Sequence, residues 1–207
     1  DAKLVALTFD DGPGATTSRL LDILKEKDVK ATFFMVGKNA ERYPAVVKRG
    51  AEEGHVIGTH SYSHQRLTAL TPEGIAEEMD KSVAVLSNIL GVAPTLMRPP
   101  GGHYNDDVIA YTKEHHQRII MWSVDTRDWE SKNKEKILET TFQETAYGVR
   151  DGAIILMHDV YATTVDAVDE MIDRLKADGY TLVTVPELLQ LRADGGEGGG
   201  VYRYLKP

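Results

Sequence analysis

Two adjacent carboxylates, Asp10 and Asp11, follow an apolar run at residues 4–9 of the 207-residue chain. Carboxylates placed side by side after a buried strand repel each other and lose solvation unless a cation or an arginine compensates. Adjacent side chains on an extended segment diverge, so one carboxylate can bind a metal while its neighbour faces a water molecule. This motif alone leaves an alternative open, an Asp-Gly turn with helix capping near Thr16.

His60 and His64 are a second pair of candidate ligands, four residues apart after the run 55–58. On one turn of helix this spacing places both imidazoles on the same face, where they suit a single divalent ion. Ser61 holds the position of the glutamate in the H-E-x-x-H motif, so the zinc-protease helix is excluded. Two histidines and one carboxylate leave coordination positions open, which is typical of a catalytic ion. Zinc is the first choice and cobalt, manganese, nickel or iron(II) the others, although two unrelated surface histidines also give this spacing.

Polar or charged residues with possible catalytic roles stand at the ends of three more apolar runs. They are Arg98, the segment 125–129 and His158. Arg98 precedes two prolines, which stiffen the chain and fix the direction of the arginine. Paired with a carboxylate, Arg98 would keep that carboxylate ionised. His158 ends the most apolar run and precedes a carboxylate, which suits a proton carrier at neutral pH. Each group alone also has a structural explanation. Arg98 can be a surface arginine before a turn, and the segment 125–129 can be a capped loop with a core tryptophan. His158 can be a core histidine whose hydrogen bonds are satisfied.

Short β-rich runs alternate with segments of helical spacing along the whole chain. The predicted strands are residues 4–9, 31–36, 55–58, 96–98, 118–124, 153–157 and 181–185. Apolar stripes predict helices within residues 20–24, 75–90, 137–147 and 165–175. This alternation predicts an α/β fold with about seven parallel strands, either an open sheet or an incomplete barrel. Because chemistry gathers at the carboxyl ends of parallel strands, we expect the polar groups to converge on one rim.

Composition places the chain among ordinary globular domains, with 42% hydrophobic and 27% charged residues. The 24 lysines and arginines against 32 aspartates and glutamates give a net charge of −8, which argues against a nucleic-acid partner. A chain of this charge has little reason to seek anionic wall polymers such as teichoic acids, so any binding of them must be local. No cysteine is present, so disulfides and thiolate metal sites are excluded. The longest apolar run, residues 153–157, is too short to span a membrane.

Helix boundaries and the chain ends complete the organisation. Thr71 followed by proline is a helix start signal, and Gly91 follows a helical stripe where a left-handed cap is expected. We expect a single domain over residues 1–207, with a glycine-rich turn at 195–200 and a closing segment at 201–207. The chain opens without a leader, as if a leader or another domain preceded it.

Five segments of the chain, in order, resemble the five motifs of the polysaccharide deacetylases, also called carbohydrate esterase family 4. They are Thr8–Pro13, His60–His64, Arg98–Gly101, Asp125–Trp129 and Leu156–His158. Each motif alone is weak, whereas five in fixed order are specific, and the resemblance covers nearly the whole chain. It implies a distorted, incomplete (β/α) barrel, similar to a TIM barrel, that removes N- or O-acetyl groups from glycans with one divalent metal ion.

The resemblance also implies a role for each matched residue. Asp10 matches the general base of the family, and Arg98 the residue that orients it. His158 matches the general acid, and Asp128 the residue that orients it. The positions that match the metal ligands are Asp11, His60 and His64.

Substrate contacts are expected around the same rim. Trp129 and Leu156 match positions that line the pocket for the acetyl methyl group. Gly101 stands where the family has an aromatic residue after two prolines, so its backbone N–H can complete the oxyanion site without an aromatic wall. Pro100 and Tyr104 are the remaining expected substrate contacts.

The function implied is removal of N-acetyl groups from N-acetylglucosamine in peptidoglycan or chitin-type chains. Alternatives are an acetylxylan esterase, which acts on O-acetyl groups, and a silent glycan-binding module on the same fold. The module would lack a metal ligand, the base or the acid, and none is missing. Structural metal binding needs a closed fourth ligand that the spacing does not offer. We expect a monomer located outside the cell or in the bacterial cell envelope.

Overall fold

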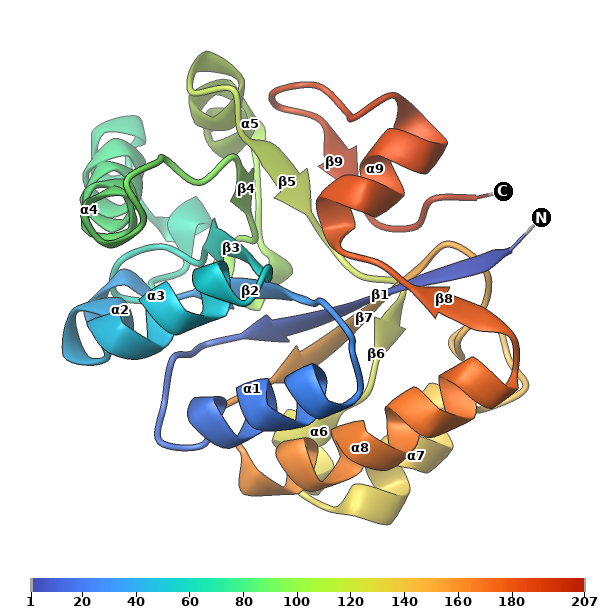
Figure 1. The fold of residues 1–207 in the computed structure, drawn as a ribbon. Coiled ribbons are helices and arrows are strands. Elements are labelled where there is room, and N and C mark those ends of the chain that lie inside the picture. Colours follow the sequence, from blue (N-terminus) through green and yellow to red (C-terminus); the bar gives the residue numbers. More distant parts are fainter. Residues whose placement is uncertain (1, 207) are drawn as a thin grey trace.

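The structure, a computed structural model, describes residues 2–206. Within them, nine strands form one parallel sheet in the order β6-β7-β1-β2-β3-β4-β5-β9, and β8 pairs with β1 outside this path (Figure 1). The strands are β1 (Lys3–Asp10), β2 (Thr32–Met35), β3 (Val56–Thr59), β4 (Leu96–Met97), β5 (Arg118–Ile120), β6 (Val124–Asp125), β7 (Ala153–His158), β8 (Tyr180–Leu182) and β9 (Val201–Tyr202).

Helices follow most strands and cover the outside of the curved sheet (Figure 1). The α-helices are α1 (Thr17–Glu26), α2 (Gly37–Arg42), α3 (Pro44–Glu52), α4 (Pro72–Leu90), α5 (Asp106–Glu114), α6 (Asp128–Ser131), α7 (Lys134–Thr141), α8 (Ala162–Ala177) and α9 (Val185–Ala193). Two short 3₁₀ turns are η1 (Leu67–Ala69) and η2 (Pro100–Gly102). No helix within residues 2–206 has the length and apolar character needed to cross a membrane.

The distorted, incomplete (β/α) barrel is confirmed, with more strands than the seven expected. The predicted strand 118–124 is split because its middle changes partners. The Met121 N–H donates to Tyr202 O at 2.7 Å, whereas the Ser123 N–H donates to Ile154 O at 3.0 Å. A further short strand, β9, pairs in parallel with β5. The predicted strand 181–185 ends at Leu182, since α9 begins three residues later.

Local signals in the sequence set several helix boundaries. The Thr71 hydroxyl accepts from the Gly74 N–H and caps α4, and Gly91 ends this helix in the left-handed region at φ 75°. The stripe predicted within 137–147 is too long, because α7 ends at Thr141 and Tyr147 lies exposed beyond it. The capping residues therefore predicted the ends of α4 correctly, whereas the apolar stripe within 137–147 did not predict the end of α7.

Side chains of β1 alternate between two environments. Val5, Leu7 and Phe9 pack outward in the core beneath the covering helices. Ala6 belongs to a second apolar cluster, with residues of α9 that fill the barrel near the start of β1. Asp10, at the other end of β1, is buried among polar groups. The inside of the barrel is thus apolar at the amino ends of the strands and polar at their carboxyl ends.

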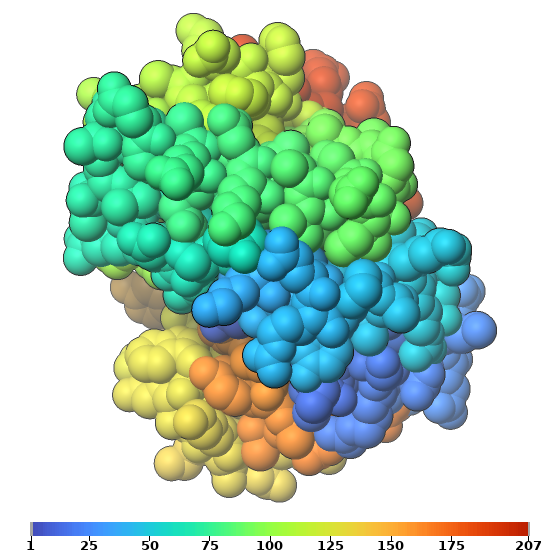
Figure 2. Space-filling model, turned by 90° about the vertical axis from the view of Figure 1, so that its left-hand side faces the viewer, coloured from blue at the N-terminus to red at the C-terminus, as the bar shows by residue number. Residues whose placement is uncertain are grey.

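The carboxyl ends of the strands meet at one rim, as the sequence predicts. Strand register brings β1 and β7 side by side, with Asp10 opposite His158. The arrowhead of β1 points toward the left of Figure 1, and Figure 2 views the molecule from that side. There the surface is hollowed between the teal segments above and the yellow and orange segments below.

Candidate active site and metal centre

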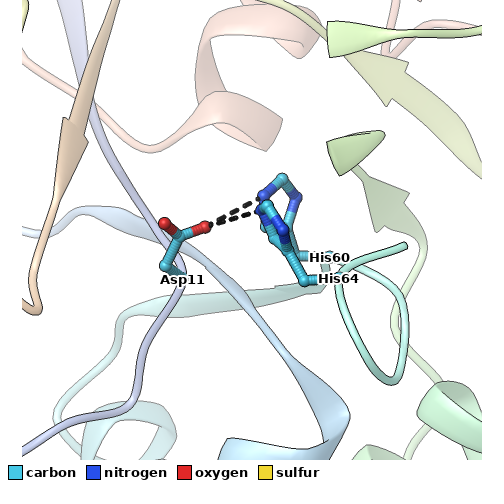
Figure 3. Close-up of side chains that lie close together, drawn as sticks. All are labelled: Asp11, His60 and His64. Atoms are coloured by element: carbon cyan, nitrogen blue, oxygen red, sulfur yellow. Dashed lines mark ion pairs between the residues drawn. The ribbon is translucent and has the colours of Figure 1, made fainter. Parts of the chain in front are cut away.

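Asp11, His60 and His64 come together at this rim as a metal-ligand cluster (Figure 3). Asp11 Oδ1 lies 3.3 Å from His60 Nε2 and 3.1 Å from His64 Nε2. A zinc ion bound tetrahedrally by nitrogen and oxygen separates neighbouring ligand atoms by about 3.3–3.6 Å. Asp11 Oδ1 is buried and has no hydrogen-bond partner among the described residues. One of the two distances lies at the edge of this range and the other 0.2 Å below it, so the donor set fits one divalent cation with open positions after a small movement of His64.

The two histidines lie on a loop and not on the helical turn that their spacing suggested. Ser61 and His64 both have a φ of 63°, and the Ser61 hydroxyl accepts from the His64 N–H at 3.0 Å. The His60 Nδ1–H donates to Arg98 O at 2.6 Å, which leaves Nε2 facing Asp11. The tight loop and this hydrogen bond orient both imidazoles toward Asp11, without a helix.

The charge state of the cluster suits a metal site. Burial alone would raise the pKa of Asp11, but the neighbouring His60 and His64 side chains lower this pKa far below its ordinary value. The adjacent Asp11 carboxylate raises the pKa of His64. Asp11 is therefore an ionised carboxylate, and a cation competes with a proton for His64.

Asp10, the neighbour of Asp11, is buried against the fully buried Arg98. Arg98 Nη1 donates to Asp10 Oδ1 at 2.9 Å and to the Thr8 hydroxyl at 2.7 Å. The other guanidinium nitrogens donate to the carbonyls of Ile120 and Met121 at 2.8 and 2.9 Å. These four hydrogen bonds fix the orientation of Arg98, which holds one oxygen of Asp10. The second oxygen, Oδ2, lies 3.7 Å from His60 Nε2.

His158 faces the same point from β7 and is held by Asp128. Its Nδ1–H donates to Asp128 Oδ1 at 2.8 Å, and its backbone N–H donates to Asp128 Oδ2 at 2.7 Å. The Thr164 hydroxyl also donates to Oδ2, at 2.8 Å. Burial lowers the pKa of His158, but the bond to Asp128 and nearby carboxylate charges outweigh it and raise the pKa to about 9. His158 is therefore protonated at neutral pH, and its Nε2 lies 3.9 Å from Asp11 Oδ2.

Substitution Asp128→Asn tests this coupling. Loss of the Asp128 charge lowers the pKa of His158, so the protonated acid is lost at a lower pH than in the wild type. We expect the alkaline limb of the kcat profile to move down by about one pH unit or more. The measurement is kcat for acetate release between pH 6 and 10; an unmoved alkaline limb would contradict the role of Asp128.

The described side chains enclose a cavity of about 250 Å³. Besides the metal-ligand cluster, its lining residues are Asp10, Gly101, Trp122, Asp125, Trp129, Leu156 and His158. Gly101, Trp129 and Leu156 were expected there, whereas Pro100 and Tyr104 do not line it. Trp122 and Asp125 were not assigned a role from the sequence, and the indole of Trp122 supplies an aromatic wall in spite of Gly101. A tryptophan near the end of the predicted strand 118–124 was the available signal.

A third residue that the sequence left without a role is Asp159, which is fully buried. The Thr17 hydroxyl donates to its Oδ2 at 2.6 Å, while burial raises the pKa of Asp159 to about 7. This carboxyl group packs against Gly12, where a Cβ atom has no room. Asp159 therefore supports the turn that carries the metal-ligand aspartate.

Substitution Gly12→Ala is expected to displace this turn. Its new methyl group would collide with the Asp159 carboxyl, at a cost of about 1–3 kcal/mol in unfolding free energy, and it would weaken metal binding. Urea unfolding and a zinc titration measure both effects. Gly50→Ala in α3 is the matched control, because its Cβ would meet Ile57 at an ordinary 3.6 Å. Equal stability and metal affinity of Gly12→Ala and the wild type would contradict the packing argument.

Comparison with known proteins gives consistent matches. A family model described as polysaccharide deacetylase matches residues 1–120. The peptidoglycan-N-acetylmuramic acid deacetylase PdaC of Bacillus subtilis is 39% identical over 191 residues, which are 92% of this chain but only 39% of that protein. A peptidoglycan-N-acetylglucosamine deacetylase of Bacillus cereus is also 39% identical, over 90% of this chain and 68% of that protein.

Solved structures agree with these sequence matches. The structure described as T48 deacetylase with substrate superposes with a TM-score of 0.89 at 39% identity, covering 97% of this chain and 96% of that one. The chain spans about two fifths of the length of the first curated relatives that it matches.

Proposed function

The chain belongs to the polysaccharide deacetylase family, and we propose that it hydrolyses the N-acetyl group of N-acetylglucosamine units in a peptidoglycan or chitin-type polysaccharide. Two relatives are named for acting on peptidoglycan, one at N-acetylmuramic acid and one at N-acetylglucosamine. The observation that carries the proposal is the grouping of the metal-ligand cluster, the Asp10–Arg98 pair and the Asp128–His158 pair around one cavity.

Hydrolysis of an amide needs an activated water, stabilisation of an oxyanion and a proton for the departing amine. A divalent cation in the metal-ligand cluster, with zinc as our first choice, supplies Lewis acidity toward the water and the acetyl carbonyl. Asp10 accepts the proton of the water on Oδ2, because Arg98 occupies Oδ1. Held in this way, Asp10 is aimed at the cavity.

His158 donates the proton that the leaving nitrogen requires. Its Nδ1–H is committed to Asp128, so the proton on Nε2 is the one delivered to the sugar amine. Gly101 has a φ of 64° and lines the cavity, where its backbone N–H donates to the oxyanion. Trp129 and Leu156 contact the acetyl methyl group from the apolar side of the same cavity.

Acetate release tests the proposal. We expect release from N-acetylglucosamine oligomers and peptidoglycan, loss after chelation and recovery with one equivalent of zinc. Faster release from acetylxylan than from both amide substrates would favour an O-acetyl esterase instead. No release from any of the three polymers by the zinc-loaded protein would contradict a deacetylase and support a glycan-binding module.

The same proposal covers the setting in which the chain works. A wall polysaccharide as substrate places it outside the cell or in the cell envelope, as a monomeric catalytic domain over residues 1–207. Relatives named as peptidoglycan deacetylases support this setting. Size-exclusion chromatography with light scattering measures the oligomeric state, and a mass of 22.9 kDa is expected.

A further inference from the structure

A larger cleft of about 960 Å³ adjoins the active-site cavity and shares Trp122, Asp125 and Trp129 with it. Its volume is within the range of ligand-binding sites. Its walls come from three parts of the sequence: residues 122–129, residues 140–150 and the C-terminal residues 203 and 204. A ligand bound in this cleft can therefore continue directly into the active site.

Aromatic and cationic side chains line this cleft. The aromatic residues are Trp122, Trp129, Tyr147 and Tyr204, and the cationic ones are Arg127, Arg150 and Arg203. Trp129 is 46% and Tyr147 75% exposed, which is unusual for side chains of this size. Aromatic rings with a polar edge offer a flat apolar face and a hydrogen bond, and a pyranose ring matches both.

Two of the three arginines lack an acidic partner. Arg127 pairs with Glu130 at 2.6 Å, but no ion pair within residues 2–206 involves Arg150 or Arg203. Arg150 stacks on the ring of Tyr204 at 4.4 Å and donates to Ala146 O.

Arg203 is exposed and donates to Trp122 O at 3.4 Å. We name the surface formed by Arg150, Arg203 and the aromatic walls the arginine cleft. It leaves two guanidinium groups available for an anion in a chain whose net charge is −8.

We propose that the arginine cleft binds a carboxylate-bearing part of the glycan, next to the sugar that is deacetylated. A planar guanidinium binds a carboxylate through two parallel hydrogen bonds, and the aromatic walls hold the sugar ring that carries it. The carboxylate belongs either to a lactyl ether on the neighbouring sugar or to an attached peptide. The inference rests on the proposed function, and it adds that anionic wall strands are preferred to neutral ones.

Substitution Arg203→Gln tests the inference, since this exposed side chain has little part in folding. We expect kcat/KM to fall about tenfold on anionic glycan strands, mainly through KM, and less than twofold on a neutral N-acetylglucosamine oligomer. High salt should reduce the difference. Arg150→Gln should act in the same direction, and Arg203→Lys should recover only part of the loss. Arg42→Gln on α2 is the control for the change in charge.

Two preparations of the anionic strand distinguish the sources of the carboxylate. A loss on peptide-free strands identifies the lactyl group, and a loss only on peptide-bearing strands identifies the peptide. Equal losses on neutral and anionic strands, or no loss on either, would overturn the inference.

The proposed function can fail separately, if the wild type releases no acetate from any strand. The intact strands then serve as ligands, and tryptophan fluorescence measures their binding. Weaker binding of the anionic strand alone by Arg203→Gln would still support the inference, and unchanged binding would overturn it.

Discussion

Asp10→Asn is expected to lower kcat by a factor of about 10²–10⁴ while the protein still binds one zinc ion per chain. The amide keeps an oxygen that accepts from Arg98, so the geometry of the buried pair is preserved. It cannot accept a proton from water, and this is the step assigned to Asp10. Acetate release under saturating substrate gives kcat, and elemental analysis after gel filtration gives the metal content.

A control separates loss of the base from loss of charge. Asp173→Asn removes a carboxylate from an exposed ion pair with Lys27 on the outside of the molecule, and wild-type turnover is expected. Urea unfolding of both variants shows whether either is destabilised. Wild-type kcat in a folded, zinc-loaded Asp10→Asn protein would remove Asp10 from the mechanism.

Arg98→Met is expected to destabilise the protein by about 3–5 kcal/mol, because one member of a buried ion pair is removed. The substitution leaves Asp10 buried without its counter-charge and removes the donor from the carbonyls of Ile120 and Met121. Metal content should persist, but kcat should fall because Asp10 is no longer held. Urea unfolding measures the first effect and acetate release the second.

A double variant tests whether the destabilisation comes from the unpaired charge of Asp10. Arg98→Met combined with Asp10→Asn removes the unpaired charge, so the two destabilisations should sum to more than the measured effect of the double variant. Arg19→Met, which breaks an exposed pair with Asp166, should change the free energy of unfolding by about 0–1 kcal/mol. Similar effects of Arg19→Met and Arg98→Met would show that burial of the pair is unimportant.

Convergence of the polar groups on one rim followed from the sequence because it depends on topology alone. Once the strands are parallel, their carboxyl ends share an edge, so Asp10 and His158 lie on the same rim. The pairing of β1 with β7, which sets these two residues opposite each other, was not predicted. The cap at Thr71 was equally predictable, since it depends on neighbouring residues only. Features fixed by chain direction or by local hydrogen bonds were therefore accessible before the structure.

Features fixed by contacts between distant segments were not accessible. The loop at His60 and His64 departs from a helix because it is anchored to Arg98 and has left-handed backbone at Ser61. The break between β5 and β6 arises because Met121 pairs with the C-terminal strand. The spacing of residues within one segment cannot predict either of these long-range contacts.

The arginine cleft is the clearest case of this limit. Arg150 and Arg203 are more than fifty residues apart in the chain and meet only because the C-terminal segment returns beside β7. From the net charge of −8, the sequence predicted little attraction to anionic wall polymers and only local binding of them. It could not indicate where, since the cleft has no continuous basic motif.

Anomalous diffraction at the zinc edge, from crystals of the zinc-loaded protein, tests the central claim most directly. The account predicts one strong peak about 2.0–2.2 Å from Asp11 Oδ1, His60 Nε2 and His64 Nε2, with Asp10 outside this distance. A peak at another site, or no peak at saturating zinc, would contradict the metal centre and the hydrolysis built on it.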